Sequence, residues 1–183
     1  GFAGVDLSFS GGASSVLGAT GIYSIAMGNN TSATSESSTA MGFNTTASDR
    51  FATAMGVSSV ASGLVSTAMG SSTIASGSNS LAVGRNSESS GFNAVATGDG
   101  VLASGDSSTA MGNNTTASGN QSVAIGWAST ATGLGSVVFG HDNDVTGNYA
   151  TAAGLGTQAN AYGSIAFGLF NVGGGNPSSI VSS

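Results

Sequence analysis

The chain has 183 residues, of which 31 are Gly, one is Pro and only 5% are charged, which excludes both a collagen helix and a charged, Pro-rich disordered segment. Two Arg and no Lys stand against eight acidic residues, for a formal net charge of −6, so we predict no nucleic-acid partner, because binding to phosphates depends on clustered Lys and Arg. The sequence has no Cys and no apolar run as long as a membrane span, which excludes disulfides and thiolate metal sites and predicts no direct membrane insertion.

Residues 1–18 precede the repeat described below and are predicted to be an N-terminal entry segment. Their apolar side chains include Phe2, Phe9 and the pair Val16 and Leu17. Terminal coils of repeat proteins are commonly atypical, because they close the end of the stack. We therefore expect this segment to cap the first coil.

Residues 19–168 consist of a 14-residue repeat. A tripeptide made of a small apolar residue, a variable residue and Gly first occurs at residues 26–28 and recurs every 14 residues up to residues 166–168. A second Gly recurs half a period after the first, as in Ala61-Ser62-Gly63. Two heptads of a coiled coil have the same length, but each Gly would cost about 1 kcal/mol inside a helix. The surrounding Ser, Thr and Val favour two short strands, each ended by a Gly turn, so one period predicts one coil of a β-solenoid.

Alternation along each strand predicts which side chains lie inside the coil, because neighbouring residues point to opposite faces. In the first strand, the positions of Ser24 and Ala26 hold almost only Ser and Ala, and in the second strand Thr31 and Ala33 have the same role. We predict that these small residues fill a thin interior.

The outward positions of the first strand predict a consistently apolar face, and one of its columns contains all five Met. A soluble monomer rarely exposes an apolar stripe of this length, so we expect the face to pack against copies of the chain around a rotation axis. The residues predicted to form this interface are Ile25, Met27, Met41, Met55, Met69, Leu81, Val83, Met111, Val123, Ile125, Val137, Phe139, Ile165 and Phe167.

His141 is the only His and is followed by Asp142, Asn143 and Asp144. No nucleophile motif accompanies His141, so we predict no catalytic residues and no enzyme activity. These oxygen-bearing side chains are also of the type that binds a hard cation. Asp and Asn in a turn more often bond their own backbone, so we predict neither a metal nor a cofactor, while a cation at this turn remains an open alternative.

Three large aromatic side chains follow or approach a turn Gly, where they can reach solvent. These residues are Phe43, Phe92 and Trp127. Exposed aromatic residues on turns are good anchors for recognition, although they can equally pack at the edges between subunits. We treat them as candidate surface-recognition residues.

Residues 169–183 break the repeat with three consecutive Gly and Pro177. We expect a C-terminal exit segment that leads into a further downstream region.

The pattern Ser-Val-Ala-Ile-Gly at residues 122–126, with Ser-Thr-Ala-Met-Gly at residues 38–42, 66–70 and 108–112, resembles the head repeat of trimeric autotransporter adhesins of the YadA type. The resemblance covers residues 19–168. It implies a left-handed parallel β-roll that forms a homotrimer through its hydrophobic strand. It also implies a non-catalytic, extracellular adhesive head on a bacterial surface fibre, attaching to a matrix protein, a glycan, another cell or an abiotic surface.

Two other functions remain open. Similar repeats occur in tail-fibre-like proteins, which leaves the shaft of a phage or injection-system fibre as an alternative. The outward Thr39, Thr53 and Thr67 suggest an ice-binding solenoid, but the neighbouring Met and the interruption at Leu81 disfavour a regular array that matches ice.

Overall fold

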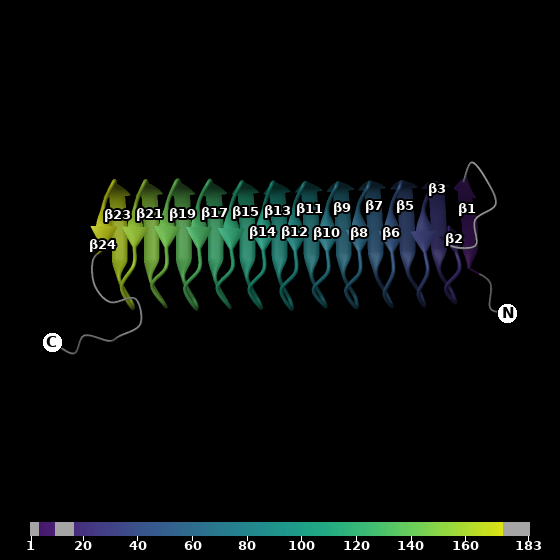
Figure 1. The fold of residues 1–183 in the computed structure, drawn as a ribbon, viewed down its shortest axis with the longest axis horizontal. Coiled ribbons are helices and arrows are strands. Elements are labelled where there is room, and N and C mark those ends of the chain that lie inside the picture. The colour runs from purple at the N-terminus through teal and green to yellow at the C-terminus, as the bar shows by residue number, and fades with distance from the viewer. Residues whose placement is uncertain (1–3, 10–16, 174–183) are drawn as a thin grey trace. The chain divides into compact units, whose positions relative to one another are not determined.

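The computed structural model describes residues 4–9 and 17–173, and every regular element within them is a β-strand. Each coil of the repeat contributes a strand of five residues and a strand of two residues. Within each of the two units described below, the long strands point one way and the short strands point the other (Figure 1). The structure divides into two compact units, residues 1–93 and 94–183. The predicted all-β class and the parallel solenoid with 14-residue coils are confirmed.

The first unit contains two parallel sheets, one made of long strands and one of short strands, and both follow chain order. Its long strands are β1 (Val5–Phe9), β3 (Ile25–Asn29), β5 (Thr39–Phe43), β7 (Thr53–Val57), β9 (Thr67–Ser71) and β11 (Leu81–Arg85). Its short strands are β2 (Gly18–Ala19), β4 (Ser32–Ala33), β6 (Thr46–Ala47), β8 (Val60–Ala61), β10 (Ile74–Ala75) and β12 (Glu88–Ser89).

The second unit repeats this arrangement. Its long strands are β13 (Val95–Asp99), β15 (Thr109–Asn113), β17 (Val123–Trp127), β19 (Val137–His141), β21 (Thr151–Leu155) and β23 (Ile165–Leu169). Its short strands are β14 (Leu102–Ala103), β16 (Thr116–Ala117), β18 (Thr130–Ala131), β20 (Asp144–Val145), β22 (Gln158–Ala159) and β24 (Val172–Gly173).

The interior of each unit is as thin as the repeat predicts. Ser24, Ala26, Thr31 and Ala33 are all buried, as are most of their equivalents in later coils. The buried hydroxyl of Ser24 donates to the carbonyl of Gly21 at 2.7 Å. Other buried hydroxyls, such as that of Thr31, have no hydrogen-bond partner in the described structure. Small apolar side chains and small hydroxyl side chains therefore fill a space that leaves little room for larger groups.

One coil of the second unit departs from this pattern. Val138 and Val145 replace Ala at interior positions, and Asn143 replaces the usual Ser or Thr. All three side chains are buried. The coil accommodates Asn143 because its side-chain amide donates to the carbonyl of Phe139 in its own coil (2.8 Å) and to that of Gly154 in the next coil (2.9 Å).

The predicted entry segment contains a strand that the repeat does not indicate. β1 pairs with β3, with Val5 opposite Ile25 and Asp6 opposite Ala26. The carboxylate of Asp6 therefore takes an inward position at the end of the stack, where it accepts hydrogen bonds from the backbone N–H (2.9 Å) and hydroxyl (2.6 Å) of Ser8. These bonds lower the pKa of Asp6, and a carboxylate at this edge discourages the addition of another strand.

The boundaries expected at residues 18/19 and 168/169 stay predictions. Phe2 and Val16 lie outside the described residues, and so do residues 174–183 of the expected exit segment. At the C-terminal side, the ladder of short strands extends past residue 168, because Val172 and Gly173 pair with Gln158 and Ala159.

The turns contain a backbone feature that the residue pattern does not reveal. Left-handed residues recur at seven-residue spacing, as at Asn30 (φ 57°) and Ser37 (φ 54°). Asn, Ser and Gly occupy most of these positions, but Val65 takes the same conformation with φ 59°. A β-branched side chain is disfavoured in this region, so Val65 carries backbone strain.

We expect Val65→Asn to stabilise the protein by about 1 kcal/mol, because Asn tolerates a left-handed backbone better than Val does. The side chain of Val65 is largely exposed, so little packing is lost. For a chain of this size the midpoint of thermal unfolding should rise by about 2–4 °C, as followed by circular dichroism.

The reciprocal control is Asn79→Val at the equivalent turn of the next coil, where φ is 57°. It should lower the midpoint by a similar amount. If neither substitution moves the midpoint, the left-handed turn does not strain Val65.

Candidate functional site

The outer face of the long strands carries the apolar residues predicted to form the interface. In the first unit, Met27, Met41, Met55 and Met69 occupy paired positions on successive strands. Each of these Met is partly exposed, as Met111 is in the second unit with 39% of its surface accessible. The structure thus places these side chains outward, while their contact with another copy stays a prediction.

Strand β1 adds two apolar residues to this face that the repeat pattern misses. Val5 stands opposite Ile25 and Leu7 opposite Met27, and both are exposed. Alternation of Val5, Leu7 and Phe9 with polar residues is the sequence signal that could have identified them.

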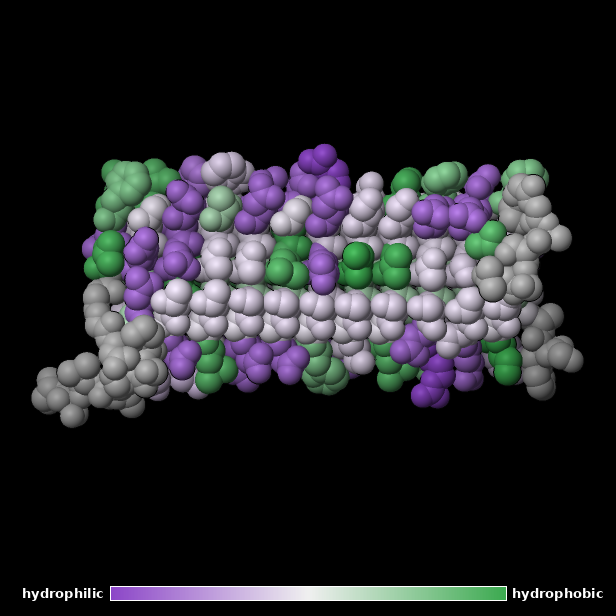
Figure 2. All heavy atoms as spheres, viewed as in Figure 1, coloured by the Kyte–Doolittle hydropathy of each residue, from purple (hydrophilic) through white to green (hydrophobic). Residues whose placement is uncertain are grey.

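The faces of the long and short strands differ in polarity. Before the turn Gly, the two outward columns of the described long strands lack charged residues, and Arg85 and Asp99 follow that Gly at the ends of β11 and β13. The outward column of the short strands includes Glu88 in the first unit and Asp144 in the second. Figure 2 shows the face of the short strands, where pale and purple residues surround isolated green ones. In the two units alike, the face of the long strands is therefore the one suited to burial against another protein surface.

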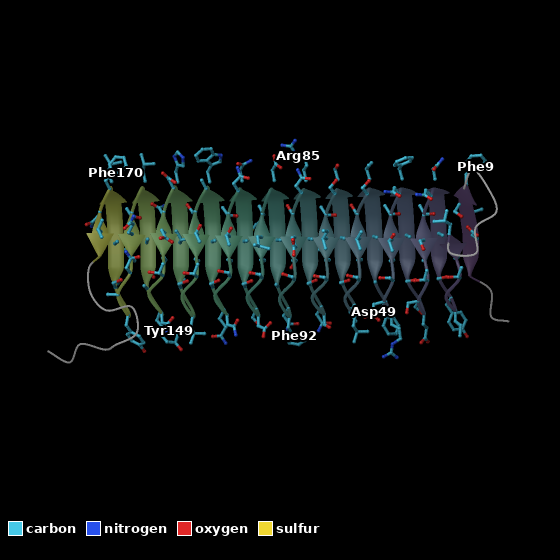
Figure 3. All side chains as sticks on the ribbon, viewed as in Figure 1. Phe9, Asp49, Arg85, Phe92, Tyr149 and Phe170 are labelled. Carbon is cyan, nitrogen blue, oxygen red and sulfur yellow. The ribbon has the colours of Figure 1, made fainter. Side chains whose placement is uncertain are left out.

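The candidate recognition aromatics do not form one site. Phe43 is the last residue of the long strand β5, whereas Phe92 lies in the turn after the short strand β12. Figure 3 shows these two turn edges of the first unit on opposite sides, with Phe9 and Arg85 on one and Asp49 and Phe92 on the other. Phe43, Phe92 and Trp127 are each about half exposed, and their role in recognition stays a prediction.

The four residues from His141 to Asp144 point in different directions. The His141 ring packs edge to face against Trp127, with ring centroids 4.3 Å apart. Asn143 points into the interior, where its side-chain oxygen accepts hydrogen bonds from the backbone N–H (2.7 Å) and hydroxyl (2.8 Å) of Thr157. Among the described residues, no three His, Cys, Asp or Glu side chains gather in a group that could hold a metal ion.

Comparison with known families decides the identity of the repeat. The sequence model of the YadA head domain repeat matches overlapping segments at residues 19–45, 33–59, 47–73, 61–87, 103–129, 117–143, 131–157 and 146–171. The chain belongs to the YadA head domain family. Heads of this family are structural adhesin domains. No curated protein gave a significant match to the whole sequence.

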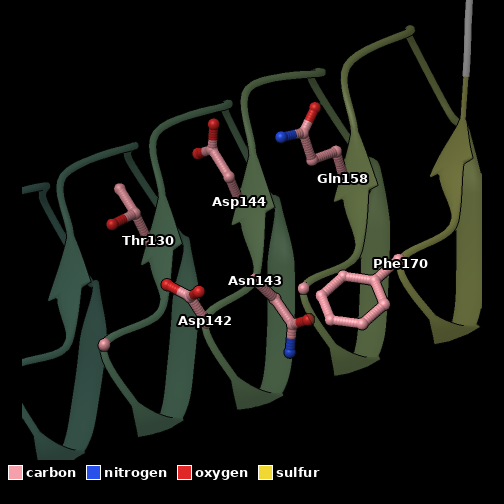
Figure 4. Close-up of a pocket in the computed structure, with 8 residues that line it drawn as sticks. Thr130, Asp142, Asn143, Asp144, Gln158 and Phe170 are labelled. Carbon is pink, nitrogen blue, oxygen red and sulfur yellow. The ribbon is translucent and has the colours of Figure 1, made fainter.

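The second unit of this YadA head has a shallow hollow of about 410 Å³ beside the short strands. Thr130, Asp144 and Gln158 lie in neighbouring short strands, and Asp142 and Phe170 lie in the adjoining turns (Figure 4). Partial burial raises the pKa of Asp144. The remaining lining residues are Ala128, Asn143 and Gly156.

None of the described segments of this YadA head is a helix with the length and apolarity needed to cross a membrane.

Proposed function

We propose that the chain is the non-catalytic head of a trimeric adhesive fibre, located outside the cell on a bacterial surface. The observation that carries the proposal is the pair of uncharged outward columns that precede the turn Gly in the long strands, within a chain of the YadA head family. Families of this kind trimerise, and three left-handed rolls that meet through these faces would remove their Met, Ile and Phe side chains from water. Burying one such side chain contributes about 1.5–3 kcal/mol.

Attachment by such a head depends on repetition of weak contacts. Three copies on one fibre present every surface feature three times, and linked weak sites raise the overall strength of attachment without any new contact. The turn edges and the face of the short strands stay accessible when the long strands pack together. These surfaces are where we place contacts with a matrix protein, a glycan, a cell or an abiotic material.

The interface can be tested with Met55→Glu. This change introduces three carboxylates near the proposed axis, and an unpaired buried charge costs several kcal/mol. We expect the trimer to dissociate into monomers in sedimentation-velocity experiments at micromolar concentration. The matched control is Ile74→Glu, which changes an exposed apolar residue on the short strands of the same unit and should leave the trimer intact.

Adhesion is tested with fluorescent beads coated with the chain. They should be retained on a matrix-protein coat, a glycan coat or bare polystyrene, and beads coated with the Met55→Glu chain should be retained less. A trimer that holds beads on none of these surfaces would contradict the adhesive part of the proposal, whereas equal dissociation of both Glu variants would contradict the proposed interface.

A further inference from the structure

The hollow beside β18, β20 and β22 owes its shape to two small residues. Ala128 and Gly156 occupy the column of left-handed turn residues that also contains Asp142 and Phe170. Neither Ala128 nor Gly156 has a side chain long enough to cover the neighbouring short strands. A hollow therefore opens beside Asp142, with the ring of Phe170 at one end, and it is lined by the outward residues of three successive coils.

The floor of the hollow alternates in hydrogen-bonding character. Thr130 pairs with Asp144, and Asp144 pairs with Gln158, so their side chains stand side by side on adjacent strands. The carboxylate of Asp144 is an acceptor, the amide of Gln158 both donates and accepts, and the hydroxyl of Thr130 does the same. Partial burial of Asp144, which raises its pKa, leaves this carboxylate less hydrated than one in open water.

The wall of the hollow combines a second carboxylate with an aromatic ring. In the column of turn residues, Asp142 precedes Gly156 by one coil and Phe170 follows it by one coil. The ring of Phe170 covers Gly156 closely, since a Cβ placed on Gly156 would lie 2.6 Å from Cδ1 of that ring. Phe170 is 69% exposed, so its apolar surface is available to a ligand.

We propose that this hollow binds a neutral sugar unit of a surface glycan. Sugar hydroxyls both donate and accept, which matches the carboxylates of Asp142 and Asp144 together with Thr130 and Gln158. The C–H face of the ring can pack on Phe170. Anionic sugars are disfavoured, because a carboxylate or sulfate would approach two Asp side chains.

A bound cation fits the same groups less well. It would leave the donors of Thr130 and Gln158 without an acceptor, and the nearby Asn143 amide is already engaged inside the coil. The inference deepens the proposed adhesive function, since it names one ligand class and one site for the same head.

Gly156→Asn tests the hollow by filling it. Asn occurs at the same turn position in several other coils, for example Asn114 with φ 50°, so the variant should fold. Its side chain would take up the space over the short strands and displace the Phe170 ring. The matched control is Gly100→Asn, since Gly100 has φ 64° against 62° for Gly156 and is not part of the hollow.

Binding is measured on immobilised neutral oligosaccharides that end in glucose, galactose or mannose, with sialylated and sulfated oligosaccharides alongside and with EDTA present. We expect binding to at least one neutral oligosaccharide, weakened at least tenfold by Gly156→Asn and by Asp144→Ala. Gly100→Asn and Asp106→Ala, which removes a carboxylate from the turn after a short strand, should bind like the unmodified chain. Circular dichroism verifies the fold of each variant.

Three results would overturn the inference: binding only to the anionic sugars, binding that Gly156→Asn leaves unchanged, or no binding to any neutral sugar. The solution mass, measured on the same samples, separates this test from the proposed function. A monomer that binds sugar would overturn the trimer alone, and a trimer that binds no sugar would overturn the hollow alone.

Discussion

Gly154→Ala is expected to destabilise the protein by about 4 kcal/mol, at the upper end of what single substitutions do. In each unit the first Gly of the repeat stacks directly on its equivalent in the next coil. A Cβ on Gly154 would lie 1.9 Å from the carbonyl oxygen of Gly168, which is a backbone atom held in the ladder. The coils would have to separate locally, which breaks backbone hydrogen bonds on both sides. Urea unfolding followed by circular dichroism measures the loss.

Gly168→Ala is the control that isolates the stacking contact. Gly168 also has a positive φ, 112° against 134° for Gly154, but a Cβ on it meets none of the described atoms within 4 Å. We expect a loss of about 1–2 kcal/mol from the backbone conformation alone. Equal losses for the two variants would show that the positive φ, rather than the close approach of neighbouring coils, requires Gly at this position.

Asn143→Ala is expected to cost about 3 kcal/mol, because it leaves several buried polar groups without a partner. The side-chain amide donates to the carbonyls of Phe139 and Gly154, and its oxygen accepts from the backbone N–H and the hydroxyl of Thr157. Asn143 is only 2% exposed, so water cannot easily replace these bonds. Thermal and urea unfolding should both report the loss.

Two further variants separate hydrogen bonding from the loss of volume. Asn171 has the equivalent position near the end of the second unit and donates to the carbonyl of Phe167 at 3.2 Å, but it is exposed. Asn171→Ala should therefore cost less than about 1 kcal/mol, because water can take over the bond. Asn143→Thr restores the residue type of other coils and should recover part of the loss. If Asn143→Ala and Asn171→Ala cost the same, burial of the amide network does not stabilise this coil.

The fold could be predicted from the sequence because two periodicities agree. The 14-residue spacing indicates a coil, and alternation within each strand assigns Ser24 and Ala26 to the interior and Ile25 and Met27 to the outside. Both assignments are confirmed. The strand β1 was missed because it does not follow the 14-residue spacing. Its residues pair with residues of β3 that lie 20 positions later, as Val5 and Ile25 show.

The left-handed turns were also missed, for a different reason. Their positions accept Tyr23, Phe51 and Val65 as well as Asn, so residue type alone does not identify them. The stacking of coils imposes the conformation on whatever residue occupies the turn.

The candidate sites were less predictable than the fold, because they depend on residues from several coils. His141, Asp142, Asn143 and Asp144 are consecutive, yet the turn and the strand send their side chains to different surroundings. The hollow requires Ala128, Asp142, Gly156 and Phe170, which are 14 residues apart and form a pattern only when the coils are aligned. An alignment of the turn residues of successive coils would have identified the small residues Ala128 and Gly156. It would not have shown that the space above them stays open.

The mass of the chain in solution tests the central claim most directly. If the long-strand faces pack around a threefold axis, light scattering coupled to size-exclusion chromatography should give a particle mass of about 52 kDa. This is three times the 17.3 kDa of one chain. A particle of 17.3 kDa at every concentration tested would contradict the account, because the apolar face that runs along the Met residues would then be stable in water without a partner.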